Sequence, residues 1–147
     1  MEKPDKRIFD FIAEHHVLNL ATLRADRPYI AHCFYVFVPE DNFFVFTSDE
    51  KTRHAKEMLD NKHVAAGIAL ETKTVGKIRG LQIEGTVAKA EGDSLSKAKK
   101  YYLKAYPYAL LHLETMWILR PTFYKLTDNR LGFGKKIIWS ADDNKNR

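Results

Sequence analysis

Three strand-like segments with very short connections dominate the first third of the chain. Residues 17–23 alternate apolar and small polar side chains, and residues 29–38 and 43–47 are rich in aromatic and β-branched side chains. Residues 24–28 and 39–42 lie between them and contain the turn formers Pro, Asp and Asn. Connections this short allow neighbouring strands to pair only in the antiparallel direction. The sequence therefore predicts a meander of three strands.

The rest of the chain predicts more strands and a few helices at the edges. Helices are expected over residues 4–14, 51–59, 93–104 and 108–113, and further strands over residues 64–70, 78–90, 116–127 and 137–139. The glycines at 80 and 85 and Pro121 predict a bend, a bulge or an edge position in the two longest of these strands. Strands that outnumber helices, without regular alternation of the two, favour a closed barrel over a doubly wound sheet.

Length and cysteine content limit the number of domains and the cellular compartment that we expect. A chain of 147 residues with 45% hydrophobic residues can bury one core, so we expect one domain over residues 1–140 and a polar tail over residues 141–147. No window is apolar enough for a membrane span, and no apolar segment follows the charged N-terminus as in a signal peptide. The single cysteine, Cys33, excludes an internal disulfide framework and is typical of the reducing cytoplasm, where we expect the protein.

The net charge of +5 suits several kinds of partner. Proteins that bind nucleic acid normally concentrate basic residues on one face, whereas the 24 basic and 19 acidic residues here are interspersed. A basic module for nucleic acid or for a protein partner is therefore the least favoured class. A small anionic ligand fits the same charge.

The end of the third predicted strand carries side chains that suit a phosphate group. Thr47 and Ser48 end the apolar run, and Lys51, Thr52 and Arg53 follow where a helix is expected to begin. A helix start offers unpaired backbone N–H groups and the positive end of the helix dipole, and the cations add formal charge. The same residues also suit a solvated loop with a helix cap, and spacing alone leaves the two alternatives open.

Histidine, cysteine and glycine patterns add a few candidates. His32 and Cys33 lie on a strand expected to line a pocket, although His32 also suits a structural role and Cys33 is expected to be a buried, inert thiol. No metal motif accompanies the His15-His16 pair, and His54, His63 and His112 are assigned no ligand role. The sequence GFGKK at 132–136 predicts either a tight turn or a glycine loop that lets Phe133 approach a planar ring.

Over nearly its whole length the chain resembles the FMN-binding split barrels, the superfamily of pyridoxamine 5'-phosphate oxidase, and within it the bacterial YhbP-type branch. The resemblance rests on the three-strand meander leading into FVFTSDEKTRHAKEML, on IRGLQIEGTV at 78–87, on Trp117, and on TDNRLGFGKKIIW at 127–139. It implies a mainly β, six-stranded Greek-key split β-barrel with peripheral helices. It also implies a homodimer that binds two FMN molecules in clefts between the subunits.

The resemblance also implies which residues hold the cofactor. The phosphate is expected at Thr47, Ser48, Lys51 and Thr52, with Arg53 nearby, and the ring along the second strand at Ala31, His32, Cys33 and Phe34. Gln82 is expected close to the cofactor or the interface. Trp117 and the Phe133, Gly134 and Lys135 segment are expected to close the site from the partner subunit, with Lys135 or Lys136 as a cation near the ring.

One departure from the family limits the expected reaction. The arginine-rich substrate motif of pyridoxamine phosphate oxidases is replaced by RGLQIEG at 79–85, so oxidation of pyridoxamine phosphate is not expected. We expect an FMN-dependent oxidoreductase that acts on an unidentified small molecule, with no metal and no recognisable catalytic acid or base. The alternatives are a non-catalytic carrier of flavin or haem, with His32 or another exposed histidine as an axial iron ligand, and a deazaflavin in place of FMN.

Overall fold

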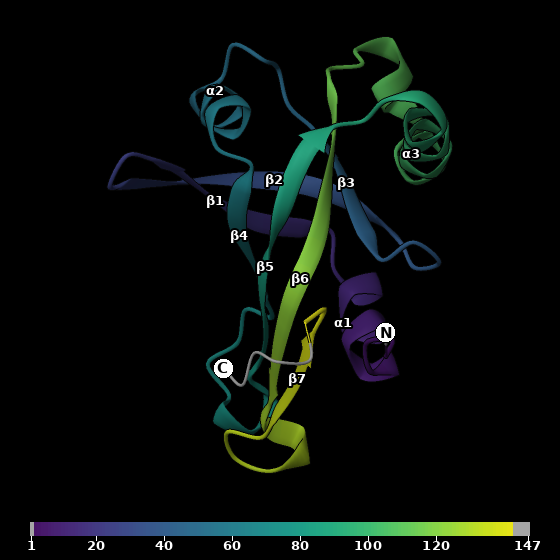
Figure 1. The fold of residues 1–147 in the computed structure, drawn as a ribbon. Coiled ribbons are helices and arrows are strands. Elements are labelled where there is room, and N and C mark those ends of the chain that lie inside the picture. Colours follow the sequence, from purple (N-terminus) through teal and green to yellow (C-terminus); the bar gives the residue numbers. More distant parts are fainter. Residues whose placement is uncertain (1, 143–147) are drawn as a thin grey trace.

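A ring of antiparallel strands forms the centre of the structure (Figure 1). The computed structural model describes residues 2–142. Its strands are β1 (Val17–Arg24), β2 (Arg27–Val38), β3 (Phe43–Thr47), β4 (His63–Ala69), β5 (Arg79–Lys89), β6 (Met116–Asp128) and β7 (Lys136–Ser140). They pair in the order β3-β2-β1-β4-β5-β6-β7, and β3 also pairs with β6. The first six strands therefore close into the predicted split barrel, and β7 extends the sheet beside the second half of β6.

Short helices surround this ring. The α-helices are α1 (Lys6–Glu14), α2 (Arg53–Asp60) and α3 (Gly92–Ala105), and the 3-10 helices are η1 (Val75–Lys77), η2 (Pro107–Leu111) and η3 (Asn129–Leu131). Helix α2 begins two residues later than predicted because Thr52 is its N-cap and accepts a hydrogen bond from the N–H of Ala55. Helix α3 is preceded by a capping box between Glu91 and Ser94, and the helix expected over 108–113 is the 3-10 helix η2.

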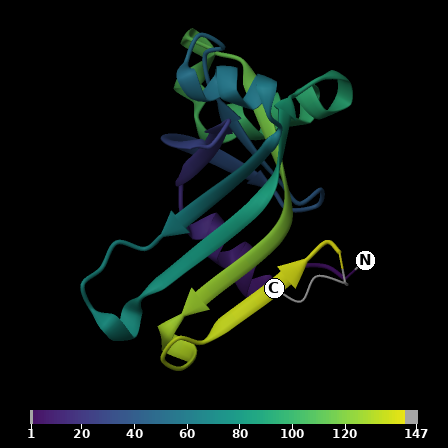
Figure 2. The same ribbon diagram turned by 60° about the vertical axis from the view of Figure 1, so that its left-hand side comes forward.

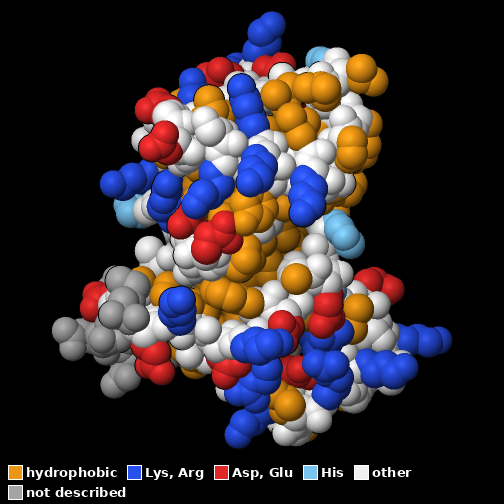
Figure 3. All heavy atoms as spheres, turned by 90° about the vertical axis from the view of Figure 1, so that its right-hand side faces the viewer, with side chains coloured by type: hydrophobic (Ala, Val, Ile, Leu, Met, Phe, Trp, Pro, Cys, Tyr) orange, Lys and Arg blue, Asp and Glu red, His pale blue; other side chains and the backbone are white. Residues whose placement is uncertain are grey.

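Two hydrophobic cores lie on opposite sides of β3 and of the first half of β6. Phe44 and Phe46 point into the barrel, where they join the buried face of α1, whereas Phe43 and Val45 point outward beneath α3. This arrangement explains why β3 and residues 116–119 are continuously apolar, since both of their faces are buried. A view from the side of α1 and α3 shows hydrophobic side chains on the floor of the groove between these helices (Figure 3).

Strands β5 and β6 extend beyond the ring as a long arm (Figure 2). A bulge bends this arm, because Glu84 pairs with Phe123 while Gly85 pairs with Pro121, which leaves Thr122 as the extra residue. A Cβ atom on Gly85 would lie 2.5 Å from the carbonyl oxygen of Arg120, so only glycine fits here. The predicted bulge near a glycine and at Pro121 is confirmed. The arm carries η3 and β7 to the end of the molecule opposite α2 (Figure 1).

No helix within residues 2–142 is both long enough and apolar enough to cross a membrane. Most of the tail predicted over residues 141–147 lies outside the described part of the chain, so this prediction stays untested.

Candidate functional site

The loop between β3 and α2, residues 47–53, is fixed from two neighbouring elements. The backbone N–H of Ser48 donates to the carbonyl of Thr115 across 3.0 Å, and the indole Nε1 of Trp117 donates to the carbonyl of Ser48 across 3.1 Å. The Oγ1 of Thr47 lies 3.3 Å from the hydroxyl of Tyr102 on α3. The two hydroxyls predicted to meet a phosphate therefore sit on a backbone that β6 and α3 hold in place.

A buried contact joins the two sides of this loop. Ser48 is 5% exposed, and its Oγ lies 2.7 Å from Nε2 of His54 in the first turn of α2. Partial burial lowers the pKa of His54, with opposing effects from Glu57 and Glu114. On the barrel side, burial raises the pKa of the Cys33 thiol to about 11, against a smaller lowering by a hydrogen bond with Ser48. The sequence pattern assigned His54 no ligand role, whereas the structure places its Nε2 beside the hydroxyls of Ser48 and Thr52.

The two cations of the loop are not equivalent. Lys51 is exposed, and its ammonium group makes no ion pair within residues 2–142. The Nε of Arg53 donates to Oε2 of the buried Glu57 across 3.0 Å, and its guanidinium carbon lies 4.0 Å from the ring centroid of Tyr29. Lys51 is thus available to an incoming anion, whereas Arg53 is held in place through its Nε and the ring of Tyr29.

The second strand presents alternate residues to the outside. His32 and Phe34 point outward, and Nδ1 of His32 lies 2.6 Å from Oδ1 of Asn19 on β1. Phe34 is 57% exposed, with its ring 6.0 Å from that of Tyr106. Cys33 points into the barrel and is 6% exposed, which confirms the expected buried thiol, whereas its expected contact with the cofactor stays a prediction. Only the backbone of Cys33 can meet a ligand on the outer face of β2.

Strand pairing places His32 and Gln82 in one row on the outer face of the sheet. The row runs through His32, Asn19, Gly67, Gln82 and Lys125, which are partners in register on β2, β1, β4, β5 and β6. Three strand spacings of about 4.8 Å separate His32 from Gln82, so the two lie roughly 14 Å apart. One planar ligand on one chain would therefore not lie directly against both side chains.

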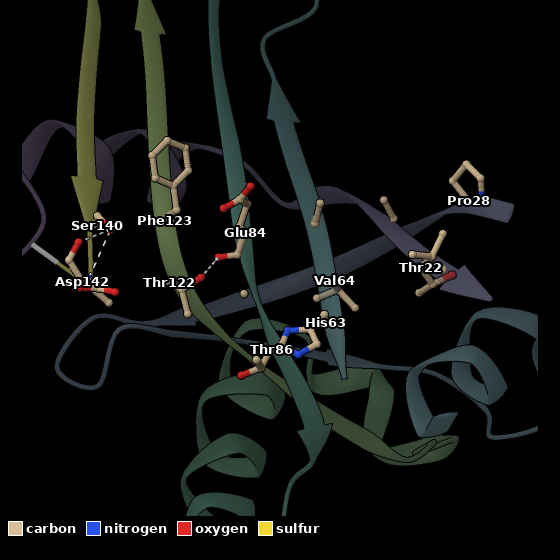
Figure 4. A pocket seen from close by; sticks show the side chains of 15 residues that line it. Thr22, Pro28, His63, Val64, Glu84, Thr86, Thr122, Phe123, Ser140 and Asp142 are labelled. Carbon is tan, nitrogen blue, oxygen red and sulfur yellow. Dashed lines mark hydrogen bonds between the residues drawn. The ribbon is translucent and has the colours of Figure 1, made fainter. Parts of the chain in front are cut away.

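A hollow of about 650 Å³ crosses the same outer face (Figure 4). The next row of the sheet runs through Ala21, Ala65, Glu84, Phe123 and Ser140, and these residues line the hollow. The two alanines on β1 and β4 leave space between larger neighbours on either side. Alternation alone did not reveal this feature, because the hollow depends on the register between strands.

The residues expected to close the site from later strands differ in exposure: one is buried in the core and the others lie in an exposed turn. Trp117 is 1% exposed inside the barrel, which corrects its assignment as a wall of the ligand site, because both faces of this part of β6 are covered. Phe133 is 87% exposed in the turn after η3, with Gly134 and Lys135 beside it. This turn, at the bottom of Figure 1, lies at the opposite end of the molecule from α2.

The 132–136 segment is a tight turn. Gly132 has a φ of 133° and Gly134 a φ of 69°, values that favour glycine, and the N–H of Gly134 donates to Oδ1 of Asn129. Within a single chain, this turn and the 47–53 loop do not meet. No group of three or more His, Cys, Asp or Glu side chains that could hold a metal ion occurs among the described residues.

Comparison with known sequences decides the family. The sequence model of the pyridoxamine 5'-phosphate oxidase family matches residues 4–124. The chain belongs to this family. Within it, the chain is 37% identical over 132 residues to a UPF0306 protein of Photorhabdus laumondii, covering 90% of this chain and 92% of that protein. It is 36% identical over 129 residues to the UPF0306 protein YhbP of Escherichia coli O157:H7, covering 88% of each. The predicted family and branch are thereby confirmed.

Solved structures share the fold at low sequence identity. A haem-binding protein of Mycobacterium smegmatis superposes with a TM-score of 0.80 at 17% identity, covering 95% of this chain and 60% of that chain. An FAD-binding protein of Mesorhizobium loti superposes with a TM-score of 0.67 at 10% identity, covering 82% of this chain and 90% of that chain. These two proteins of the same fold are thus described as binding haem and FAD, respectively.

Proposed function

We propose that this protein binds FMN and is an oxidoreductase for a small organic molecule. The observation that supports this most is the loop at one end of the barrel, which carries the Thr47 and Ser48 hydroxyls and leads into the start of α2. It also carries the exposed Lys51, whose ammonium makes no ion pair within residues 2–142. Hydroxyl donors, a cation and a helix N-terminus are the groups that bind a phosphate. The donor set therefore fits the phosphate of FMN, and Thr52 belongs to it as the helix cap.

The outer face of β2 beside this loop fits the rest of the cofactor. Phe34 offers an exposed aromatic surface, and His32 offers a polar group beside it. When bound, FMN supplies electron-transfer chemistry that side chains lack, and the protein supplies binding, orientation and a fixed electrostatic environment. Lys51 and the loop hydroxyls would orient the phosphate, and Phe34 would exclude water from one side of the ring.

A homodimer completes this proposal. Phe133, Gly134 and Lys135 lie at the far end of the same chain, so a contact between them and the cofactor needs a second copy. The outer hollow gives that copy a surface on which to pack, since Ala21 and Ala65 allow a close approach of side chains from a partner. Two copies related by a twofold axis would place each 132–136 turn at the other copy's 47–53 loop.

The visible absorption spectrum tests the cofactor. We expect flavin bands that stay with the protein through gel filtration after FMN is added. Ser48→Ala combined with Lys51→Ala should weaken FMN binding strongly while the far-ultraviolet circular dichroism stays unchanged. Lys56→Ala, which removes another exposed cation from α2, is the matched control and should bind normally. Unchanged affinity in the double variant would overturn the site, and a monomer at micromolar concentration in sedimentation would overturn the shared cleft.

Haem is the second candidate ligand. The observation that favours it is His32, an exposed histidine on the outer face of β2 whose ring is held by Asn19, since an imidazole can act as an axial iron ligand. A Soret band that appears on adding haem and is lost in His32→Ala would support this candidate over FMN. A deazaflavin would show its own absorption when offered in place of FMN.

A basic module for nucleic acid or protein is favoured by no specific observation. Lys and Arg side chains are interspersed with Asp and Glu on the face shown in Figure 3. Such a module would retain no chromophore and would bind nucleic acid with steep salt dependence.

A further inference from the structure

His54 is placed to sense whatever the 47–53 loop binds. Its Nε2 lies 2.7 Å from Oγ of Ser48 and 3.5 Å from Oγ1 of Thr52, so two hydroxyls assigned to the phosphate already converge on one ring nitrogen. The hydroxyl of Thr52 donates to the carbonyl of Asp49 and caps α2, so Ser48 is the hydroxyl here that can turn to an anion. An anion that accepts a hydrogen bond from Ser48 must therefore lie next to this nitrogen. A neutral imidazole whose Nε2 accepts a hydrogen bond from Ser48 offers such an anion a lone pair, which repels it.

The surroundings of His54 keep the ring neutral before an anion arrives. Desolvation disfavours the charged form and is the largest effect, so the pKa of His54 is lowered from its usual value. Two carboxylates oppose this, Glu57 from the same helix and Glu114 from the segment before β6. Cys33, beyond Ser48, is an uncharged thiol at neutral pH because burial raises its pKa to about 11.

The other charged groups of the loop are already engaged or point to solvent. The carboxylate of Asp49 accepts the N–H of Lys51, and Glu50 is paired with Lys89 and Thr115. Arg53 is paired with Glu57, and Lys51 is exposed. Among these groups, His54 is therefore the one that can change its charge near neutral pH on the inner side of the loop.

We propose that His54 takes up a proton when the 47–53 loop binds an anion, and that the resulting imidazolium donates its Nε2 hydrogen to that anion. The inference rests on the proposed function, because it assigns to the phosphate site a residue that senses the ligand's charge. The proton comes from solvent, and no bond is made or broken besides N–H formation on the ring. Ser48 exchanges its hydrogen bond with His54 for one to the anion.

The sign of the pH dependence follows directly. An anion within about 4–6 Å raises the pKa of a histidine by roughly 1–3 units. Between the lowered pKa of the free protein and the raised pKa of the complex, binding is accompanied by uptake of about one proton. The association constant should therefore fall by up to about tenfold for each pH unit of increase within that window.

Titration calorimetry at pH 7 measures this uptake directly. The enthalpy of FMN binding is measured in buffers with different ionisation enthalpies. The slope of the observed binding enthalpy against the buffer's ionisation enthalpy gives the number of protons taken up. FMN also titrates near this pH through its own phosphate, but that contribution is the same for every variant. Sulfate, which does not titrate between pH 5 and 8, and riboflavin, which lacks the phosphate, are the companion ligands.

Two substitutions separate the charge of His54 from its shape. His54→Asn should lower FMN affinity and remove close to one proton from the uptake, whereas His54→Lys, with a permanent cation, should keep the affinity and lose the uptake. His16→Asn, which removes an exposed histidine that makes no contact with Ser48 among the hydrogen bonds of residues 2–142, should show the proton uptake of the unmodified protein. Thermal unfolding of each variant checks that it folds.

The outcomes divide cleanly. A proton uptake with FMN and sulfate but not with riboflavin, lost in His54→Asn and in His54→Lys, supports the inference. Equal uptake in the unmodified protein and in His54→Asn overturns it and leaves FMN binding at this loop intact. Absence of any FMN or sulfate binding in the unmodified protein overturns both the inference and the proposed site.

Discussion

The indole Nε1 of Trp117 and the backbone carbonyl of Ser48 are joined by a hydrogen bond of 3.1 Å. Trp117 is 1% exposed and packs in the barrel core, whereas Ser48 begins the loop that we assign to the phosphate. The contact therefore connects core packing to the geometry of the site. Under the proposed function, Trp117 would act through the position of Ser48 and would not touch the ligand.

Trp117→Phe should weaken both stability and FMN binding. The Ser48 carbonyl would lose its donor, and a buried acceptor left without a partner costs about 1–3 kcal/mol. Urea unfolding measures the first effect and FMN titration the second. Trp139→Phe is the matched control, since Nε1 of Trp139 donates to the carbonyl of Glu2 at 2.8 Å. The control should lose less stability, because Glu2 is exposed and water can replace the lost donor, and it should keep its FMN affinity. A parallel loss of affinity in both variants would contradict the connection.

Gly85→Ala should destabilise the β5–β6 arm. The added Cβ would lie 2.5 Å from the carbonyl oxygen of Arg120 and 3.1 Å from Cδ2 of Leu119, so backbone must move. Overpacking of this kind costs about 1–3 kcal/mol. Gly76→Ala, where nothing lies within 4 Å of the new atom, should leave the melting temperature nearly unchanged. Equal melting temperatures for the two variants would show that the bulge does not require glycine.

Sequence patterns were sufficient for the main helices and strands and for placing the 47–53 loop between a strand end and a helix start. The hydroxyls at 47 and 48 follow an apolar strand, and the helix start follows them, so their meeting at one end of the barrel is local in the sequence. The bulge was visible for the same reason, because Gly85 and Pro121 each disturb a strand that is otherwise regular. Both features depend on nearest neighbours along the chain.

Contacts between distant elements were beyond such patterns. Trp117 was expected at the ligand because the family resemblance implies that later strands of the partner subunit close the site. In the structure, α3 covers one side of this part of β6 and the barrel core covers the other. Alternation on β2 shows that neighbouring residues point to opposite faces, but not which of the two faces is the inner one. The sequence therefore could not tell whether His32 or Cys33 points outward. The role proposed for His54 depends on the loop bringing its ring back to Ser48. The spacing of residues in the sequence does not predict this contact.

Cys33 should be almost inert toward thiol reagents in the folded protein. Burial raises its pKa to about 11, so at pH 8 only about one thiol in a thousand is ionised, and the thiolate is the reactive form. The rate of modification by a chromogenic disulfide should therefore rise as pH rises, and should increase sharply when urea unfolds the chain and returns the pKa to its usual value of 9.0. Rapid labelling of the folded protein at pH 8 would contradict the buried, neutral thiol.

The most decisive prediction concerns the two ends of the molecule. If each site combines the 47–53 loop of one copy with the 132–136 turn of the other, Lys51→Ala and Lys135→Ala damage complementary halves. Each variant alone should bind FMN weakly at both of its sites. In a mixed dimer, one site carries both substitutions and the other carries none. Mixing equal amounts, with unfolding and refolding to exchange subunits, should therefore restore tight binding at about a quarter of all sites.

The control is a mixture of Lys51→Ala with the doubly substituted Lys51→Ala, Lys135→Ala chain, in which no dimer contains an intact site. FMN retained through gel filtration counts the tight sites in both mixtures. Recovery only in the complementary mixture requires that the turn reaches the loop of the partner. No recovery, with dimers demonstrated by sedimentation, would mean that each site is built within one chain. The 132–136 turn would then have no part in binding FMN, because the fold places it at the opposite end of its own chain from α2.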